Sequence, residues 1–335
     1  MRFSNWINTV DTHTEGEPTR IITSGIGPIP GRSMAEKALF FTGNMDSVRT
    51  SLMTEPRGHK NMFGCLLTEP TLPGADYGVI FMDSGGYMSM CGHATIGVCT
   101  VLSELGMVKV KEPSTRIRLE SVSGLVDATV VFKGGRAESV SFRNVPAFGE
   151  YLNSELDVPG LGRLKVDVGF GGNYFVFFEA DEAGLEILPK NIEKIIDAGM
   201  KVREAANQTL PVQHPQIKGI NSIYVATIVG KPQNPKAAYR NVHVFSNRQF
   251  DHSPGGTGTS ARMAVLHAKG ELGLNKEIQS ESITGGLFKG RLLEEIQLGS
   301  KRAVISEITG RAFITVFHQF VIDGDDPLND GFLIQ

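Results

Sequence analysis

Cys91 stands where a helix is expected to begin, and a second copy of this helix start lies 164 residues later with glycine in the cysteine position. The run Cys91-Gly92-His93-Ala94-Thr95 matches Gly255-Gly256-Thr257-Gly258-Thr259, and the register holds as far as Gly106 and Gly270. A chain that repeats a glycine-rich helix start but keeps a single thiol predicts an asymmetric site. We expect Cys91 to carry its chemistry.

The chemistry follows from the position of the thiol. A cysteine at a helix N-terminus lies in the field of the helix dipole and near unpaired N–H groups, and both favour the thiolate. We therefore expect Cys91 to act as a base or nucleophile. The backbone N–H groups of Gly92, His93, Gly256 and Thr257 predict a cradle for an anion such as a substrate carboxylate. Holding the carboxylate would make the adjacent Cα–H easier to remove.

The other two cysteines have a structural interpretation. Cys99 lies eight residues after Cys91 on the same expected helix, and Cys65 lies in an apolar strand, so both are expected in the core. Three cysteines, an odd number, argue against a disulfide framework and for a reducing compartment. His93 alone would be an ordinary polar turn residue, but beside Cys91 it becomes a candidate partner for the thiolate or for the substrate.

Composition and motifs exclude several classes of function. The net charge is −3 and the basic residues are scattered, so nucleic acid is not expected as a partner. No run approaches the roughly 18 apolar residues of a membrane span, and the first six residues do not resemble a signal peptide, which predicts a cytoplasmic protein. Gly256-x-Gly258-x-x-Ala261 matches a dinucleotide fingerprint only loosely, because polar residues precede it where a buried strand should end. No zinc or phosphate-loop motif occurs, so we expect no cofactor and no metal.

The order of predicted elements indicates an α/β (α+β) protein of two pseudo-symmetric halves, 1–158 and 159–335, although strands near 125–150 and 300–335 would cross between them. Each half is expected to wrap strands around one central helix, with the ligand in the cleft between the halves. The proline- and glycine-rich segment 146–162 is expected to be the hinge. Helices are predicted near 33–51 and 191–206, and strands at 63–67, 78–82, 116–131, 139–142, 222–229, 242–245, 282–293 and 303–317.

Several motifs, in order along essentially the whole chain, resemble those of the proline racemase superfamily, which includes proline racemases, hydroxyproline 2-epimerases and trans-3-hydroxy-L-proline dehydratases. The matching runs are Asp11-Thr12-His13-Thr14-x-Gly16-Glu17-Pro18, Glu55-Pro56-Arg57-Gly58-His59, Ser89-Met90-Cys91-Gly92-His93, Phe170-Gly171-Gly172, Asp251-x-Ser253-Pro254-x-Gly256-Thr257-Gly258-Thr259-Ser260-Ala261 and Asp325-Asp326-Pro327-Leu328-x-x-Gly331-Phe332. The family motifs also contain Glu17, Arg57 and Asp326, to which we assign structural roles.

The resemblance implies a diaminopimelate epimerase-like fold, a homodimer, and cofactor-independent chemistry at Cα of proline or hydroxyproline. Racemases and epimerases of the family use two opposed cysteines, at the positions of Cys91 and Gly255. One thiolate removes the proton from one face and the other thiol delivers a proton to the opposite face. The further implied binding residues are Asp251 and His93 for the ring nitrogen, Gly92, His93, Gly256 and Thr257 for the carboxylate, and Phe63 and Phe245 against the ring.

The sequence departs from the family pattern at two positions. Gly255 replaces the second acid/base, and His252 stands where arginine is common. The family's dehydratases usually carry threonine, not glycine, at the first of these positions. With glycine there, the opposite face has no proton donor except water, which disfavours two-base racemisation.

The leading hypothesis is therefore a lyase, a trans-3-hydroxy-L-proline dehydratase that gives Δ1-pyrroline-2-carboxylate with Cys91 as its only thiol base. The first alternative is an isomerase, a proline racemase or hydroxyproline epimerase whose second cysteine is replaced by Gly255, naturally or by engineering. The other alternative is a catalytically silent proline-binding protein that keeps the carboxylate cradle.

Overall fold

The computed structural model describes residues 3–334, which form two compact units. Among these residues, one unit comprises 3–140 with 311–334, and the other is Ser141–Gly310. The chain thus passes between the units twice, after Val140 and after Gly310. The sequence suggested halves of 1–158 and 159–335, with strands near 125–150 and 300–335 crossing between them. Met1 and Arg2 of the opening segment lie outside the described residues. Within 3–334, no helix combines the length and apolar character that crossing a bilayer requires.

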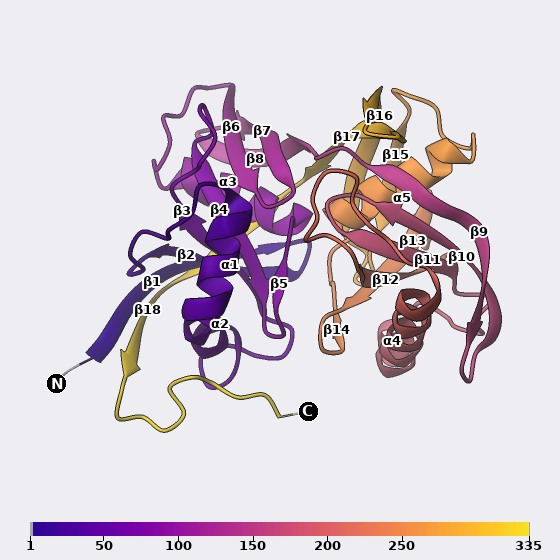
Figure 1. Ribbon diagram of the computed structural model, residues 1–335. Helices are drawn as coiled ribbons and strands as arrows, with labels where there is room; N and C mark the ends of the chain where they lie inside the picture. Colours follow the sequence, from indigo (N-terminus) through magenta and orange to yellow (C-terminus); the bar gives the residue numbers. More distant parts are fainter. Residues whose placement is uncertain (1–2, 335) are drawn as a thin grey trace. The chain divides into compact units, whose positions relative to one another are not determined.

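The first unit is built on a curved run of paired strands (Figure 1). Its antiparallel pairs are β1 with β18, β1 with β2, β3 with β4, β4 with β5, and β6 with β7, while β2 with β3 and β4 with β6 are parallel. The elements are β1 (Phe3–Thr14), β2 (Glu17–Ser24), α1 (Met34–Asn44), α2 (Asp46–Met53), β3 (Phe63–Thr68), β4 (Tyr77–Asp83), β5 (Tyr87–Met88), α3 (Gly92–Glu104), β6 (Ser114–Ser121), β7 (Gly124–Lys133), the start of β8 (Arg136–Arg143), and β18 (Ala312–Asp323).

The second unit repeats this pattern strand by strand. Its antiparallel pairs are β9 with β10, β10 with β11, β12 with β13, β13 with β14, β15 with β16, and β16 with β17, while β11 with β12 and β13 with β15 are parallel. The elements are β9 (Phe148–Val158), β10 (Gly162–Phe170), β11 (Tyr174–Glu179), a 3₁₀ turn (Pro189–Asn191), α4 (Ile192–Thr209), β12 (Ile223–Gly230), β13 (Tyr239–Phe245), β14 (Gln249–Phe250), α5 (Gly256–Ala268), β15 (Glu277–Glu281), β16 (Leu287–Leu298) and β17 (Lys301–Gly310).

The repeat extends to buried side chains. The carboxylate of Glu120 accepts hydrogen bonds from the N–H groups of Thr71 and Leu72, at 2.5 and 2.9 Å. Glu281, at the same place in the second unit, accepts from the N–H groups of Gln233 and Asn234, at 2.7 and 3.0 Å. Both glutamates are almost fully buried. Each carboxylate therefore stabilises a loop by accepting hydrogen bonds from backbone N–H groups that water does not reach.

Each unit has one central helix, as the sequence predicted. α3 and α5 both span 13 residues in the same register. Twelve of the residues of α3 are buried, because strands β1, β2, β3, β7 and β18 pack around it. α5 is surrounded in the same way by β9, β10, β11, β16 and β17. Because strands enclose each of these helices over most of its surface, the fold holds both helix starts in place.

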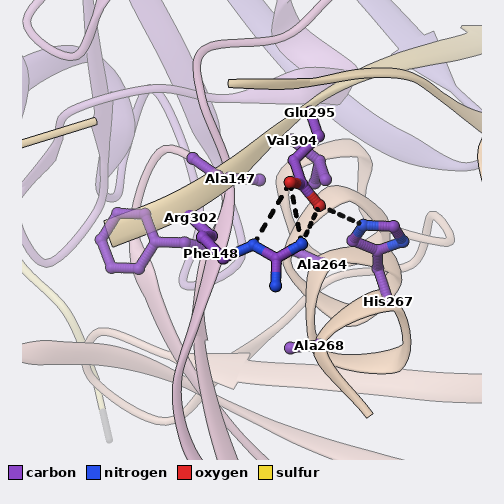
Figure 2. A pocket seen from close by; sticks show the side chains of 9 residues that line it. Ala147, Phe148, Ala264, His267, Ala268, Glu295, Arg302 and Val304 are labelled. Carbon is purple, nitrogen blue, oxygen red and sulfur yellow. Dashed lines mark hydrogen bonds and ion pairs between the residues drawn. The ribbon is translucent and has the colours of Figure 1, made fainter. Parts of the chain in front are cut away.

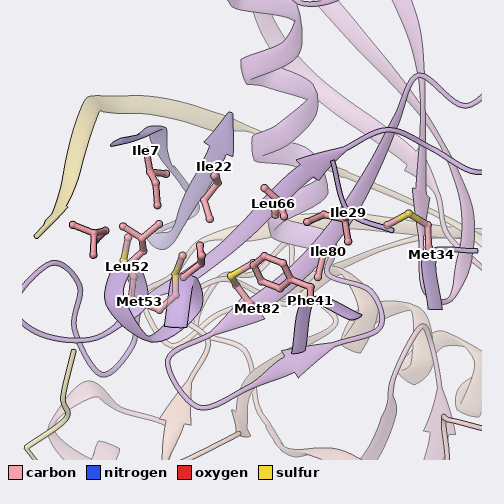
Figure 3. Packing of buried hydrophobic residues seen from close by; sticks show 13 residues of the cluster. Ile7, Ile22, Ile29, Met34, Phe41, Leu52, Met53, Leu66, Ile80 and Met82 are labelled. Carbon is pink, nitrogen blue, oxygen red and sulfur yellow. The ribbon is translucent and has the colours of Figure 1, made fainter. Parts of the chain in front are cut away.

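The outer face of the first unit's strands is covered by α1 and α2. Alternate residues of β3 and β4 point to this side, where Leu66, Ile80 and Met82 meet Phe41 of α1 and Leu52 of α2 (Figure 3). All five side chains are at most 3% exposed. This cluster stabilises the layer that carries β3 and β4 beside α3.

Four sequence predictions need correction. The segment 146–162 is not a free hinge, because most of it forms the eleven-residue strand β9, which contains Gly149, is flanked by Pro146 and Pro159, and pairs with β10. The predicted strand 282–293 begins later, at Leu287, after the turn that follows β15. The predicted strands 116–131 and 303–317 are each two strands. A turn at Val122–Ser123 separates β6 from β7, and the single residue Arg311 separates β17 from β18.

Candidate active site

Cys91 is the N-cap residue of α3. Its backbone is extended, with φ −139° and ψ 125°, and its sulfur accepts a hydrogen bond from the N–H of Ala94 at 3.4 Å. Its carbonyl accepts from both the N–H and the hydroxyl of Thr95, at 3.1 and 2.6 Å. The thiol therefore lies at the positive end of the helix dipole with a backbone donor directed at it, an arrangement that favours negative charge on sulfur.

His93 lies directly beside this sulfur. Its Nδ1 atom is 3.3 Å and its Nε2 atom 3.7 Å from Cys91 Sγ. The imidazole packs edge-on against the ring of Phe63 from β3, with ring centroids 4.6 Å apart, and its carbonyl accepts from the Thr14 hydroxyl at 3.0 Å. The first unit thus brings together Cys91, His93 and Phe63, all almost fully buried.

The other thiols are unsuited to proton transfer. Complete burial raises the pKa of both Cys65 and Cys99 well above the usual value for a thiol. Neither forms a disulfide, and both side chains contribute to the core. The prediction that these two cysteines are structural is confirmed, and Cys91 differs from them by its place at a helix terminus.

Gly255 is the N-cap of α5, but its backbone differs from that of Cys91. Its φ is +73° and ψ 106°, a left-handed conformation that favours glycine. Its N–H donates to the hydroxyl of the fully buried Ser253 at 3.1 Å, and its carbonyl accepts from the N–H of Thr259 at 2.9 Å. Asp251 stands just before this turn, where its carboxylate accepts from the N–H of Ser253 at 2.7 Å.

The second unit brings the remaining predicted residues to this turn or to the strand beside it. Phe245 ends β13 and packs against Tyr224, with ring centroids 6.3 Å apart. Its cross-strand partners are Val225 and Gln249. Gly256 and Thr257 form the first turn of α5, and the first N–H groups of a helix point outward along its axis. The predicted residues of the second unit are Asp251, Gly255, Gly256, Thr257 and Phe245, and each is buried.

Sequence reasoning missed His243, which lies against the Gly255 turn. Its Nε2 atom is 2.9 Å from the carbonyl oxygen of Pro254, and its Nδ1 atom is 2.7 Å from the hydroxyl of Thr227. Asn241, two residues earlier on the same face of β13, also donates to the Pro254 carbonyl, at 3.0 Å. The available signal was two polar residues, Asn241 and His243, at alternate positions of the strand and separated by the apolar Val242.

Family-motif residues outside this region have structural roles. Arg57 forms an ion pair with Asp326 at 3.4 Å and donates to the carbonyl of Asn329 at 3.2 Å. Arg20 forms a buried ion pair with Asp11 at 2.9 Å and also donates to the carbonyl of Leu52 at 2.6 Å. These contacts fasten α2 to the strands and to the segment after β18.

A cavity of about 200 Å³ in the second unit lies away from the predicted residues (Figure 2). It borders the last turn of α5, roughly 15 Å along the helix from Gly255. Its polar groups bind one another: the carboxylate of Glu295 accepts from Arg302 at 2.9 Å and lies 3.1 Å from His267 Nε2. These contacts hold the pKa of Glu295 below its usual value. The cavity contains none of the predicted site residues.

Comparison with known proteins agrees with this architecture. The family model described as proline racemase matches residues 9–333. A proline racemase from Clostridioides difficile is 46% identical over the full length of both chains, and a trans-3-hydroxy-L-proline dehydratase from Burkholderia ambifaria is 39% identical, also over full length. The crystal structure of a hydroxyproline epimerase from Agrobacterium vitis with bound trans-4-hydroxy-L-proline superposes with a TM-score of 0.95 at 31% identity, covering 100% of this chain and 96% of the other.

These similarities confirm the α/β fold predicted from the sequence. The matching proteins are racemases, epimerases and a dehydratase, so this protein is an enzyme of isomerase or lyase type. The chain belongs to the proline racemase family.

Proposed function

We propose that this enzyme is a trans-3-hydroxy-L-proline dehydratase in which Cys91 is the only thiol base. The observation that carries the proposal is the difference between the two helix starts. α3 presents a thiol with an N–H donor and an imidazole beside it, whereas α5 begins with a glycine in a left-handed conformation. The second helix start thus offers backbone N–H groups but no side chain at position 255 to exchange a proton.

The reaction needs one base on one face of the ring. The thiolate of Cys91 removes the Cα proton, and the electron pair left on Cα expels the hydroxyl group from C3. The proton now on sulfur passes to the departing hydroxyl, which leaves as water, and the thiolate is regenerated. The remaining enamine moves a proton from nitrogen to C3 and becomes Δ1-pyrroline-2-carboxylate.

Stereochemistry makes a single thiol sufficient for this substrate. In trans-3-hydroxy-L-proline the hydroxyl is trans to the carboxylate and therefore on the same ring face as the Cα hydrogen. One group can remove the hydrogen and return the proton to the hydroxyl without crossing the ring. Racemisation instead requires a donor on the opposite face, where position 255 supplies none.

We assign binding roles to the remaining predicted residues. The N–H groups of Gly92 and His93, with those of Gly256 and Thr257, bind the substrate carboxylate and stabilise the charge that develops next to it when the proton leaves. Asp251 and the His93 side chain bind the ring nitrogen. The phenyl rings of Phe63 and Phe245 pack against the ring carbons.

The second candidate is a proline racemase that uses water as its second acid. It is favoured by the 46% identity to the Clostridioides difficile proline racemase, which exceeds the 39% identity to the Burkholderia ambifaria dehydratase. We rank it second because water held only by backbone groups is a weaker acid than the positioned side chain that efficient general acid catalysis uses.

We further propose that the enzyme is a homodimer. Trp6 of β1 and Val321 of β18 are cross-strand partners whose side chains are 60% and 41% exposed. An exposed apolar pair of this kind favours association. Analytical ultracentrifugation at micromolar concentration tests it: a species of twice the mass of the 36.3 kDa chain is expected, and a single monomeric species contradicts it.

The activity is tested with three substrates, L-proline, trans-4-hydroxy-L-proline and trans-3-hydroxy-L-proline. The dehydratase forms a ring imine from the 3-hydroxy substrate alone. D-proline from L-proline without any imine supports the racemase, and an epimer of the 4-hydroxy substrate supports the epimerase alternative. Binding of all three without turnover leaves a silent binding protein. Cys91→Ser serves as the inactive control in each assay.

A further inference from the structure

The peptide between Pro254 and Gly255 is held by an unusual number of donors. The carbonyl of Pro254 lies 2.9 Å from His243 Nε2, accepts from Asn241 Nδ2 at 3.0 Å, and accepts from the Thr259 hydroxyl at 3.4 Å. A carbonyl with donors on both lone pairs cannot rotate without leaving buried polar groups unpaired. The plane of this peptide, and with it the φ of Gly255, is therefore fixed by the side chains of β13 and α5.

The hydrogen bonds define the state of His243. Nε2 lies 2.9 Å from the Pro254 carbonyl oxygen and 2.7 Å from Asn241 Nδ2, and Nδ1 lies 2.7 Å from the Thr227 hydroxyl. We assign the proton to Nε2, because a carbonyl oxygen can only accept, and Nδ1 then accepts from the Thr227 hydroxyl. Burial lowers the pKa of His243 to about 4, which keeps the imidazole neutral at physiological pH. The ring of Phe175 packs edge-on against it, with centroids 5.7 Å apart.

The same imidazole occupies the space that a side chain at position 255 would enter. A Cβ atom built on Gly255 would overlap His243 Nε2 and Cδ2, and one built on Gly258 would overlap Cε1. The ring is 3% exposed and its neighbours Thr227, Asn241 and Phe175 are also buried, so it can move aside only by displacing packed side chains. Two features therefore disfavour a side chain at position 255: the left-handed backbone conformation, and the overlap of a Cβ atom with the imidazole.

The first unit shows the same helix start with a side chain at the N-cap position. There the matching residue, Cys91, has an extended backbone, and the matching threonine, Thr95, donates to the carbonyl of Cys91 instead of the preceding carbonyl. The strand registers pair Phe63 with Asp83 as they pair Val225 with Phe245, so the residue that matches His243 is two positions before Asp83 and is Phe81. A phenyl ring cannot bind a carbonyl as a donor.

We propose that His243 is a positioning residue that commits position 255 to glycine and so restricts the enzyme to one thiol. The inference rests on the proposed function for its consequence, single-base chemistry. It also predicts an energetic coupling between residues 243 and 255 that can be measured whatever reaction the enzyme catalyses. A cysteine introduced at 255 would become a second acid/base only when the imidazole is removed and the peptide is free to adopt the conformation seen at Cys91.

The test is a double-mutant cycle on the full-length enzyme with Gly255→Cys, His243→Ala and the double variant. Urea unfolding measures stability, and chiral chromatography measures D-proline formed from L-proline. We expect Gly255→Cys alone to be strongly destabilised and to form no D-proline. In the double variant the two losses should not add, with a coupling of at least about tenfold in the unfolding equilibrium constant.

The double variant should also gain D-proline formation. In that reaction the thiolate of Cys91 removes the Cα proton of L-proline from one face. The thiol introduced by Gly255→Cys then donates its own proton to Cα from the opposite face. Proton exchange with solvent afterwards returns both sulfurs to their starting protonation states, so the cycle is balanced.

Each outcome decides the inference. If Gly255→Cys folds as stably as the unmodified enzyme, or if the two losses simply add, His243 does not determine residue 255. The cycle is repeated with Gly255→Ala, the smallest side chain, in case the cysteine variants do not fold. The same coupling is expected there, and its absence overturns the proposal.

The two proposals fail in different experiments. If the unmodified enzyme forms D-proline and no ring imine, the proposed dehydratase function fails while the stability cycle is unaffected. If the cycle shows no coupling, the role of His243 fails whatever reaction the enzyme catalyses.

Discussion

The sulfur of Cys91 lies 3.3 Å from Nδ1 of His93, two residues further along the same helix start. The imidazole is held in turn by the ring of Phe63, and the sulfur accepts the N–H of Ala94. The thiol, the imidazole and the backbone donor are therefore assembled within one unit, on elements that are buried and mutually packed. The matching helix start at Gly255 has no side chain in the position of the thiol.

Replacement of Cys91 by serine should abolish turnover, with a loss of at least about 10³-fold in kcat, because a serine hydroxyl is a much weaker acid than a thiol and supplies almost no anionic base near neutral pH. The change is nearly isosteric, so the fold should persist. Activity on trans-3-hydroxy-L-proline and the circular dichroism spectrum are the two measurements. Cys99→Ala, on the same helix, is the matched control and should remain active. Full activity in Cys91→Ser would remove the thiol from the reaction.

The carboxylate cradle is tested by deleting a single N–H group. Thr257→Pro removes the N–H at the second position of α5, where proline is compatible with a helix, and should raise KM by about tenfold or more. Thr257→Ala keeps the N–H and should leave KM within about threefold, which separates the backbone group from the side chain. Equal KM values for the two variants would contradict a role for this N–H in binding the carboxylate.

The stability of the protein should fall in mild acid because of His243. Its pKa is about 4 in the folded state and near 6.5 in the unfolded chain, so the unfolded chain takes up the proton first. The contribution of His243 to the free energy of unfolding is therefore fully present above pH 6.5. It is lost as the pH falls toward 4, and the loss is at most about 3 kcal/mol. Burial lowers the pKa of His214 and His252 as well, so their contributions have the same sign.

Urea unfolding at pH 7 and pH 4.5 measures this loss. His243→Gln keeps an N–H donor but cannot titrate, so its stability should decline less over the interval than that of the unmodified protein. His13→Gln, which removes a partly exposed imidazole, is the matched control. An identical acid loss in His243→Gln and the unmodified protein would show that the buried imidazole does not titrate as described.

The repeated glutamates should contribute equally to stability. Glu120→Gln and Glu281→Gln each remove the negative charge from the oxygen that accepts two backbone N–H groups, and put an amide NH₂ group in place of the other carboxylate oxygen. Each substitution should cost about 1 to 3 kcal/mol of unfolding free energy, measured in urea, with catalytic constants little changed. Glu138→Gln, at a partly exposed position of β8, is the control and should cost under about 0.5 kcal/mol. A loss confined to one of the two buried glutamates would contradict their equivalence.

Much of the fold could be predicted from the sequence because the helix-start motif and the order of elements around it occur twice along the chain. The register between Cys91 and Gly255 predicted two equivalent helices, and α3 and α5 begin and end in that register. The strand order could not be obtained in this way, because pairings such as β1 with β18 join residues roughly 300 positions apart along the chain. No local pattern encodes such a pairing.

The site was predictable where a residue has its own chemistry and not where its role depends on neighbours. Cys91 and His93 stood out by type and spacing, and the structure brings them into contact. His243 gave only a weak signal, as a polar residue between Val242 and Val244 on a strand that also carries Asn241. Its importance comes from the carbonyl of Pro254 and from the missing side chain at Gly255, which lie more than ten residues away along the chain.

The most direct test of single-base chemistry is the fate of L-proline in D₂O. L-proline presents its Cα hydrogen on the same face as trans-3-hydroxy-L-proline but has no hydroxyl to expel. If Cys91 acts alone, NMR should show deuterium entering Cα while chiral chromatography shows the amino acid remaining L-proline. Deuterated D-proline appearing as fast as the Cα hydrogen is lost would demonstrate a second acid on the opposite face and would contradict this account.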